Sequence, residues 1–77
     1  MNDPKQVKKF LMLERKVDRA YDIIERNAVF IEGYLDMEQY DDAYQQVLEM
    51  KRAITTIRKT RVTLDAMDVD VSEMPVA

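Results

Sequence analysis

Apolar residues recur at three- and four-residue steps along two long stretches of the chain. The first row comprises Phe10, Leu13, Val17, Ala20 with Tyr21, Ile24, Ala28, Ile31 and Leu35. The second row comprises Ala43, Val47, Met50, Ile54, Ile57 and Leu64, with Arg61 interrupting it. Because this spacing places side chains on one side of an α-helix, the pattern predicts two amphipathic helices, over about 4–35 and 40–66.

The start of the first predicted helix carries a clear signal. Asp3 is a suitable N-cap, and Pro4 suits the first helical position because its missing N–H costs nothing there. Gln6 stands at the position that completes a capping box. We therefore expect the helix to begin at Pro4.

The connection between the helices is best placed within residues 36–42. Asp41 and Asp42 are available there to favour the start of the second helix, through capping and through the helix dipole. A short turn between two long helices predicts an all-α fold, an antiparallel two-helix hairpin of the coiled-coil type. A single continuous helix through Gly33 is the alternative.

The turn resembles a known helical repeat over about ten residues. The segment Gln39-Tyr40-Asp41-Asp42-Ala43 is similar to the inter-helix turn of a tetratricopeptide repeat, and Tyr34 stands where that repeat favours an aromatic residue. Glu38 takes the place of the usual turn glycine, and the chain holds no second copy of the unit. The resemblance implies a helical hairpin, and it does not extend to a solenoid.

Further apolar residues lie beside the two main rows, near the predicted turn. They are Ile23, Asn27, Phe30 and Tyr34 in the first helix, with Asn27 the polar member, and Tyr40, Tyr44 and Leu48 in the second. One explanation is ordinary amphipathic overflow covered by Lys and Arg stems. The other is a partner-binding surface, since grouped aromatic side chains are typical of interfaces. We expect the second, and self-association into a helical bundle is its simplest form.

Composition excludes most catalytic and metal chemistry. The 77 residues include no Cys and no His, which rules out thiolate nucleophiles, imidazole bases and the usual zinc, haem and iron–sulfur ligands. We expect no catalytic residue, metal, cofactor or small-molecule substrate. The longest apolar run, residues 10–13, predicts neither a signal peptide nor a membrane span. With no membrane partner and no cysteine, a cytoplasmic location is the expectation.

Charge is unevenly distributed along the chain. Residues 5–20 carry a net +4, residues 22–49 a net −7, residues 51–61 a net +5 and residues 65–77 a net −4. A hairpin brings the two basic segments together at its open end. This predicted basic pole comprises Lys5, Lys8, Lys9, Lys16, Arg52, Arg58, Lys59 and Arg61. It could bind a nucleic-acid backbone, dock onto an acidic protein surface, or serve solubility and the helix dipole.

The C-terminal residues change character. Asp68, Val69, Asp70 and Val71 alternate with a period of two, and Pro75 follows, so residues 68–77 are predicted to form a flexible, acidic, non-helical tail. Residues 1–67 then form a single helical-hairpin domain. The tail is a frayed terminus, a strand added to a partner's sheet, or a segment folded back over the basic pole.

These features predict a non-enzymatic protein–protein interaction module. A self-associating subunit, a small adaptor, a chaperone-like partner and an inhibitor of a larger protein all fit. The apolar residues near the turn and the charge-polarised surface are its expected contact surfaces. Hairpins of this size are common as accessory factors of bacteria and phages, which is an analogy of fold. The alternative is a nucleic-acid-associated accessory protein that uses the basic pole.

Overall fold

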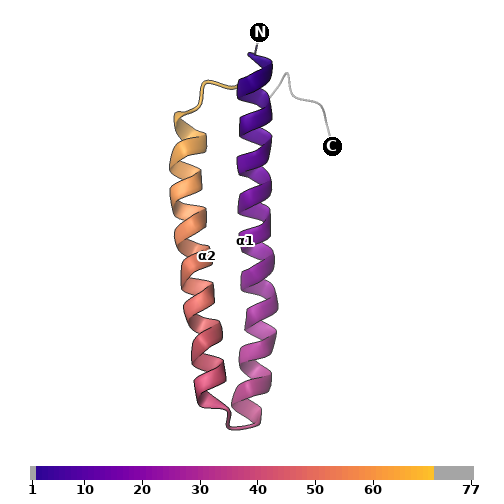
Figure 1. The fold of residues 1–77 in the computed structure, drawn as a ribbon, viewed down its shortest axis with the longest axis vertical. Helices are drawn as coiled ribbons and strands as arrows, with labels where there is room; N and C mark the ends of the chain where they lie inside the picture. The colour runs from indigo at the N-terminus through magenta and orange to yellow at the C-terminus, as the bar shows by residue number, and fades with distance from the viewer. Residues whose placement is uncertain (1, 71–77) are drawn as a thin grey trace.

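Two long helices form an antiparallel hairpin (Figure 1). In the computed structural model of the chain, residues 2–70 are described. Helix α1 spans Pro4–Asp36 and helix α2 spans Tyr40–Ala66. The molecule measures 55 × 22 × 15 Å, so it is a flat rod one helix thick. The predicted all-α hairpin and the bounds of both helices are confirmed, and the single continuous helix does not form.

Helix α1 begins at Pro4 with Asp3 as its N-cap, as the sequence predicts. The Asp3 side chain accepts a hydrogen bond from the Lys5 backbone N–H at 3.0 Å, and Pro4 occupies the first turn. Helix α2 begins at the predicted residue, Tyr40, but its N-terminus is not capped by an aspartate. Gln39 is its N-cap and makes no side-chain capping bond, whereas Asp41 and Asp42 lie within the first turn. The two acids therefore favour this helix end through the dipole alone.

The turn between the helices is three residues long and closes α1 with two backbone bonds. The Glu38 N–H donates to the Leu35 carbonyl at 3.1 Å, and the Gln39 N–H donates to the Tyr34 carbonyl at 2.8 Å. Glu38 adopts a left-handed backbone with φ of 58°. This combination is a Schellman motif, in which the left-handed position usually holds glycine.

The open end is crossed by the residues that follow α2. Residues 68–70 are not helical, in agreement with the predicted tail. The Asn2 side-chain amide donates to the Asp70 carbonyl and accepts from the Asp70 N–H, both at 2.8 Å. This stretch therefore folds back onto the start of α1. The remainder of the predicted tail, residues 71–77, lies outside the described residues.

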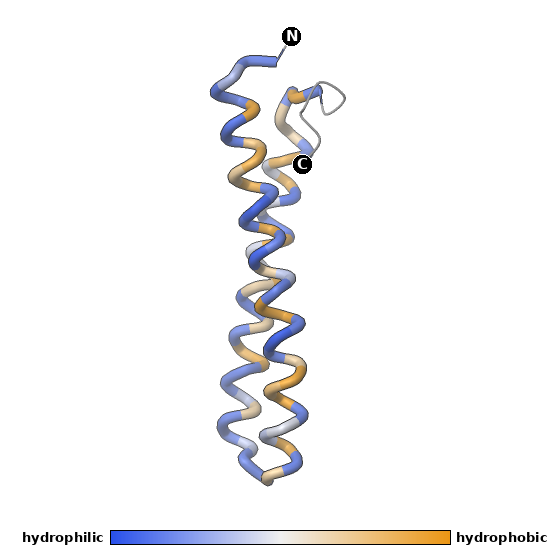
Figure 2. Tube along the Cα trace, turned by 90° about the vertical axis from the view of Figure 1, so that its right-hand side faces the viewer, coloured by the Kyte–Doolittle hydropathy of each residue, from blue (hydrophilic) through white to orange (hydrophobic). Residues whose placement is uncertain are grey.

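The core between the helices is narrow, and three of the five apolar residues buried within the described chain are alanines. The five are Val17, Ala20, Ala43, Ala53 and Leu64. Apolar positions nevertheless recur along the full length of both helices (Figure 2). Many large apolar side chains must therefore lie outside the seam between the helices.

Candidate functional site

The seam between the helices follows a strict coiled-coil spacing of alternating three- and four-residue steps. On α1 the seam residues are Phe10, Leu13, Val17, Ala20, Ile24, Asn27, Ile31 and Tyr34, all buried or half-buried. On α2 they are Ala43, Gln46, Met50, Ala53, Ile57, Thr60 and Leu64, also buried or half-buried. Most residues of the packing rows predicted from apolar periodicity lie in this seam. The prediction is wrong at five positions, because Tyr21, Ala28, Leu35, Val47 and Ile54 are exposed.

An ion pair beside the seam defines how the helices are paired. Glu14 Oε1 lies 3.9 Å from Arg61 Nη1. Both residues are half-exposed or exposed, so the pair sits on the surface along one broad side of the hairpin. In an antiparallel pair the same side recurs every seven residues, forward along α1 and backward along α2. This register places Tyr21 level with Ile54, and Leu35 level with Tyr40.

These flanking positions create an exposed apolar strip. Leu35 is 48% exposed, Ile54 is 46% exposed and Tyr40 is 63% exposed. We call this strip the apolar face. It consists of the apolar residues that flank the seam on this side and of the half-buried seam residues beneath them. It comprises Tyr21, Ile24, Ala28, Ile31 and Leu35 of α1 and Tyr40, Val47, Met50 and Ile54 of α2. The face occupies the half of the hairpin nearest the turn.

The two outer edges of the apolar face carry opposite charges. Along α1 the edge positions are Asp18, Glu25 and Glu32, which are all exposed. Along α2 the corresponding positions are Tyr44, Lys51 and Arg58, which are also exposed. We call these the acidic rim and the basic rim. Along the hairpin axis, this register places Asp18 within about one residue of Arg58, which is a rise of about 1.5 Å. Glu25 lies equally close in level to Lys51.

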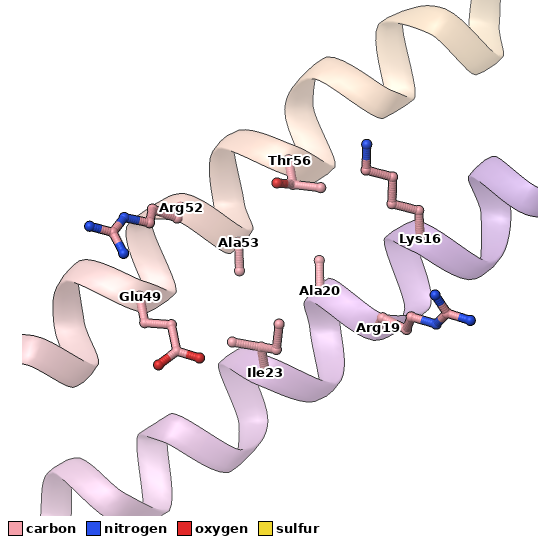
Figure 3. A pocket seen from close by; sticks show the side chains of 8 residues that line it. All are labelled: Lys16, Arg19, Ala20, Ile23, Glu49, Arg52, Ala53 and Thr56. Atoms are coloured by element: carbon pink, nitrogen blue, oxygen red, sulfur yellow. The ribbon is translucent and has the colours of Figure 1, made fainter.

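The opposite broad side of the hairpin is basic. A shallow hollow there is lined by Lys16, Arg19, Ala20, Ile23, Glu49, Arg52, Ala53 and Thr56 (Figure 3). Ala20 and Ala53 point toward each other at its centre, while the guanidinium groups of Arg19 and Arg52 point away on either side. The small alanines bring the two backbones together, and the long cations stand at the edges.

The predicted partner-binding residues do not form one surface. Asn27 is buried in the seam, and Ile23, Tyr34 and Leu48 are half-buried. Phe30 is exposed on the basic side, one heptad from Ile23. Tyr40 and Tyr44 are exposed, at the apolar face and its rim. The two predicted rows therefore lie on opposite sides of the hairpin, although both are near the turn as expected.

The predicted basic pole also divides between the sides. Helical spacing places Lys5, Lys9, Lys16, Arg52 and Lys59 on the basic side. Arg58 lies in the basic rim, and Arg61 is paired with Glu14. Lys8 lies on the outer edge of α1, one heptad before Arg15.

Sequence reasoning missed most of the apolar face because it assigned those residues to the seam. Around residues 20–35 the apolar arc of α1 is wider than a single neighbouring helix can cover. A ranking by hydrophobicity then prefers Leu35 and Ala28 to Tyr34 and Asn27. The signal that could have identified the seam was the unbroken alternation of three- and four-residue steps in each helix. This alternation includes small and polar residues, namely Ala20 and Asn27 in α1 and Thr60 in α2.

The described part of the chain offers no constellation suited to metal binding. In residues 2–70 no group of three acidic side chains converges into a possible metal site, and the whole chain lacks Cys and His. Neither described helix is long and apolar enough to cross a membrane.

Comparison of the chain with protein-family models, with curated proteins and with solved structures finds no match in any of the three.

Proposed function

We propose that this protein is a non-enzymatic protein–protein interaction module that acts through the apolar face and the charged rims beside it. The observation that carries the proposal is the distribution of side-chain size. Ala20 and Ala53 occupy buried positions of the seam, whereas the larger Tyr40, Val47 and Ile54 are left at the surface. Contiguous exposed apolar strips edged by polar residues are typical of protein interfaces.

The size of the molecule supports the same proposal. A domain of 77 residues with one seam buries little apolar surface, and such small domains usually gain stability from a partner. A self-associating subunit, an adaptor, a chaperone-like partner and an inhibitor all use a surface of this kind. We place the module in the cytoplasm, where a chain without cysteine is at no disadvantage.

The test compares two matched double variants. Val47→Asp with Ile54→Asp puts two charges at the centre of the apolar face. Val29→Asp with Val62→Asp makes the same change at two more exposed valines on the outer edges of the helices. The immobilised proteins are offered a tagged copy of the chain and a cell extract. Loss of retained protein with the first variant only supports the proposal, and equal retention by both variants contradicts it.

A second candidate is a nucleic-acid-associated accessory protein, as the alternative from the sequence suggests. The favouring observation is that cations from both helices share the basic side, with Lys16, Arg19 and Arg52 around one hollow. Such a surface would bind phosphates with a strong dependence on salt. Titration of labelled single- and double-stranded oligonucleotides at low salt tests it, with Lys16→Glu and Arg52→Glu as the disrupting change. No binding at low salt contradicts this candidate.

A further inference from the structure

The apolar face is exposed to solvent, and the distribution of charge along its edges indicates which partner would bury it. The face runs along one broad side of the hairpin, between an acidic rim on α1 and a basic rim on α2. A surface with opposite charges on its two long edges is complementary to a copy of itself, provided that the copy is turned so that its edges are exchanged.

We propose that the occupant of the apolar face is a second copy of this chain, and that the two copies form a two-fold four-helix bundle with both turns at the same end. This inference rests on the proposed function and adds the identity and orientation of the partner. Each α1 then packs against the partner's α2, so that every neighbouring pair of helices in the bundle is antiparallel.

The charges decide this orientation. A two-fold axis parallel to the helices exchanges the two edges of the face, which sets each acidic rim beside the partner's basic rim. Asp18 then lies at the level of the partner's Arg58, and Glu25 at the level of the partner's Lys51. The symmetry makes each of these pairs twice. A two-fold axis across the helices would instead place α1 against α1, and acid would face acid.

The apolar residues favour the same orientation. With both turns at one end, Leu35 and Tyr40 meet the partner's apolar residues at the same level. With the turns at opposite ends and the rods fully overlapped, these two residues would lie level with the partner's open end, around Lys5, where the apolar face does not extend. Turn-to-turn packing therefore places apolar groups on apolar groups.

The broad side that carries the apolar face also has the required extent. The broad sides of the hairpin measure 55 × 22 Å. Stable protein interfaces bury about 800 Å² on each partner, which fits within one such side. Four-helix bundles bury a second layer of apolar side chains in the same way, and the half-buried Ile24, Ile31 and Met50 would form part of that layer.

The main experiment exchanges rim charges and mixes the products. Lys51→Glu with Arg58→Glu makes both rims acidic, and Asp18→Lys with Glu25→Lys makes both rims basic. We expect the wild-type protein to have twice the 9.1 kDa mass of the chain in light scattering. Each variant alone should self-associate at least about tenfold more weakly, since like charges face each other. An equimolar mixture should restore the dimer.

All four substitutions are at exposed positions, so circular dichroism should show unchanged helix content. A mixture that associates no better than either variant alone overturns the proposal. A wild-type chain that is monomeric at high micromolar concentration also overturns it. The monomeric chain could still bind a different protein, and Val47→Asp with Ile54→Asp could abolish that binding. In that case the proposed interaction function stands, and only the second copy as partner is rejected.

A cysteine pair tests the orientation separately, because the chain has no cysteine of its own. Asp18→Cys with Arg58→Cys puts thiols on the two outer edges of one hairpin, and they come together only between copies. Oxidation should give a covalent dimer on a non-reducing gel. The control, Arg19→Cys with Arg52→Cys, has a similar placement across the basic side and should stay monomeric. Equal dimer yields from both pairs overturn the proposed orientation.

Discussion

Asn27 of α1 donates from its side-chain amide to the backbone carbonyl of Gln46 in α2, at 3.4 Å, from a position that is only 4% exposed. Asn27 therefore sits in the seam, with Ile24 and Ile31 as its nearest seam neighbours on the same helix. The bond is long, so it offsets only part of the cost of burying the amide. A single buried asparagine of this kind can select one register at some cost in stability.

Asn27→Leu should stabilise the hairpin by about 1–2 kcal/mol, because an apolar side chain of similar size replaces a weakly bonded amide. The measurement is urea unfolding followed by circular dichroism, at one fixed protein concentration. Asn27→Asp is the matched control, since it keeps the shape but faces a carbonyl oxygen with a carboxylate. It should destabilise by about 3 kcal/mol. A destabilising Asn27→Leu would show that the amide contributes more than its geometry suggests.

The helices themselves could be predicted because their signals are local. Asp3 and Pro4 mark the start of α1, and the expected end of α2 agrees with the structure to the residue. Capping and helical periodicity act within a few residues of each other, so the chain around each helix end is sufficient to place it. The antiparallel pairing followed from the short connection.

The side of each helix that packs could not be chosen by the same means. Tyr34 and Asn27 face α2, whereas the more hydrophobic Leu35 and Ala28 do not. The side of each helix that packs depends on the side chains of all the seam layers together. The small Ala20 and Ala53 meet in one layer, and their packing constrains the register of the other layers. The candidate site is hard to predict for the same reason. A residue assigned to the wrong side of its helix is predicted to be buried when it is exposed, or exposed when it is buried.

Gly33→Ala should stabilise the protein by about 0.5–1 kcal/mol. Gly33 lies inside α1, where glycine loses more backbone entropy on folding than alanine does. A methyl group added there would meet no atom within 4 Å, so it introduces no clash. Thermal unfolding should show a rise of a few degrees, since about 1 kcal/mol shifts Tm by roughly 4–8 °C in a domain of this size. A lowered Tm would reveal a constraint on this residue beyond its own helix.

Glu38→Gly should stabilise the hairpin by about 1 kcal/mol, because glycine adopts the left-handed conformation without the steric cost that Glu38 meets at φ of 58°. The substitution also removes one negative charge from an acidic turn. Glu38→Gln separates the two effects, since it removes the charge and keeps the side chain. We expect Glu38→Gln to change the free energy of unfolding by less than about 0.5 kcal/mol. Equal gains from both variants would assign the effect to charge.

Ala20→Leu and Ala28→Leu together test which side of α1 packs against α2. Ala20 is 3% exposed and points toward Ala53 across the seam, so a larger side chain there must push the helices apart. Overpacking of this kind costs about 1–3 kcal/mol. Ala28 is exposed on the apolar face, where leucine has room and should leave the stability of the hairpin unchanged or increased. Denaturant unfolding of both variants checks the difference. Because the apolar periodicity alone would put Ala28 in the seam as well, comparable destabilisation by both substitutions would contradict the register on which the apolar face depends.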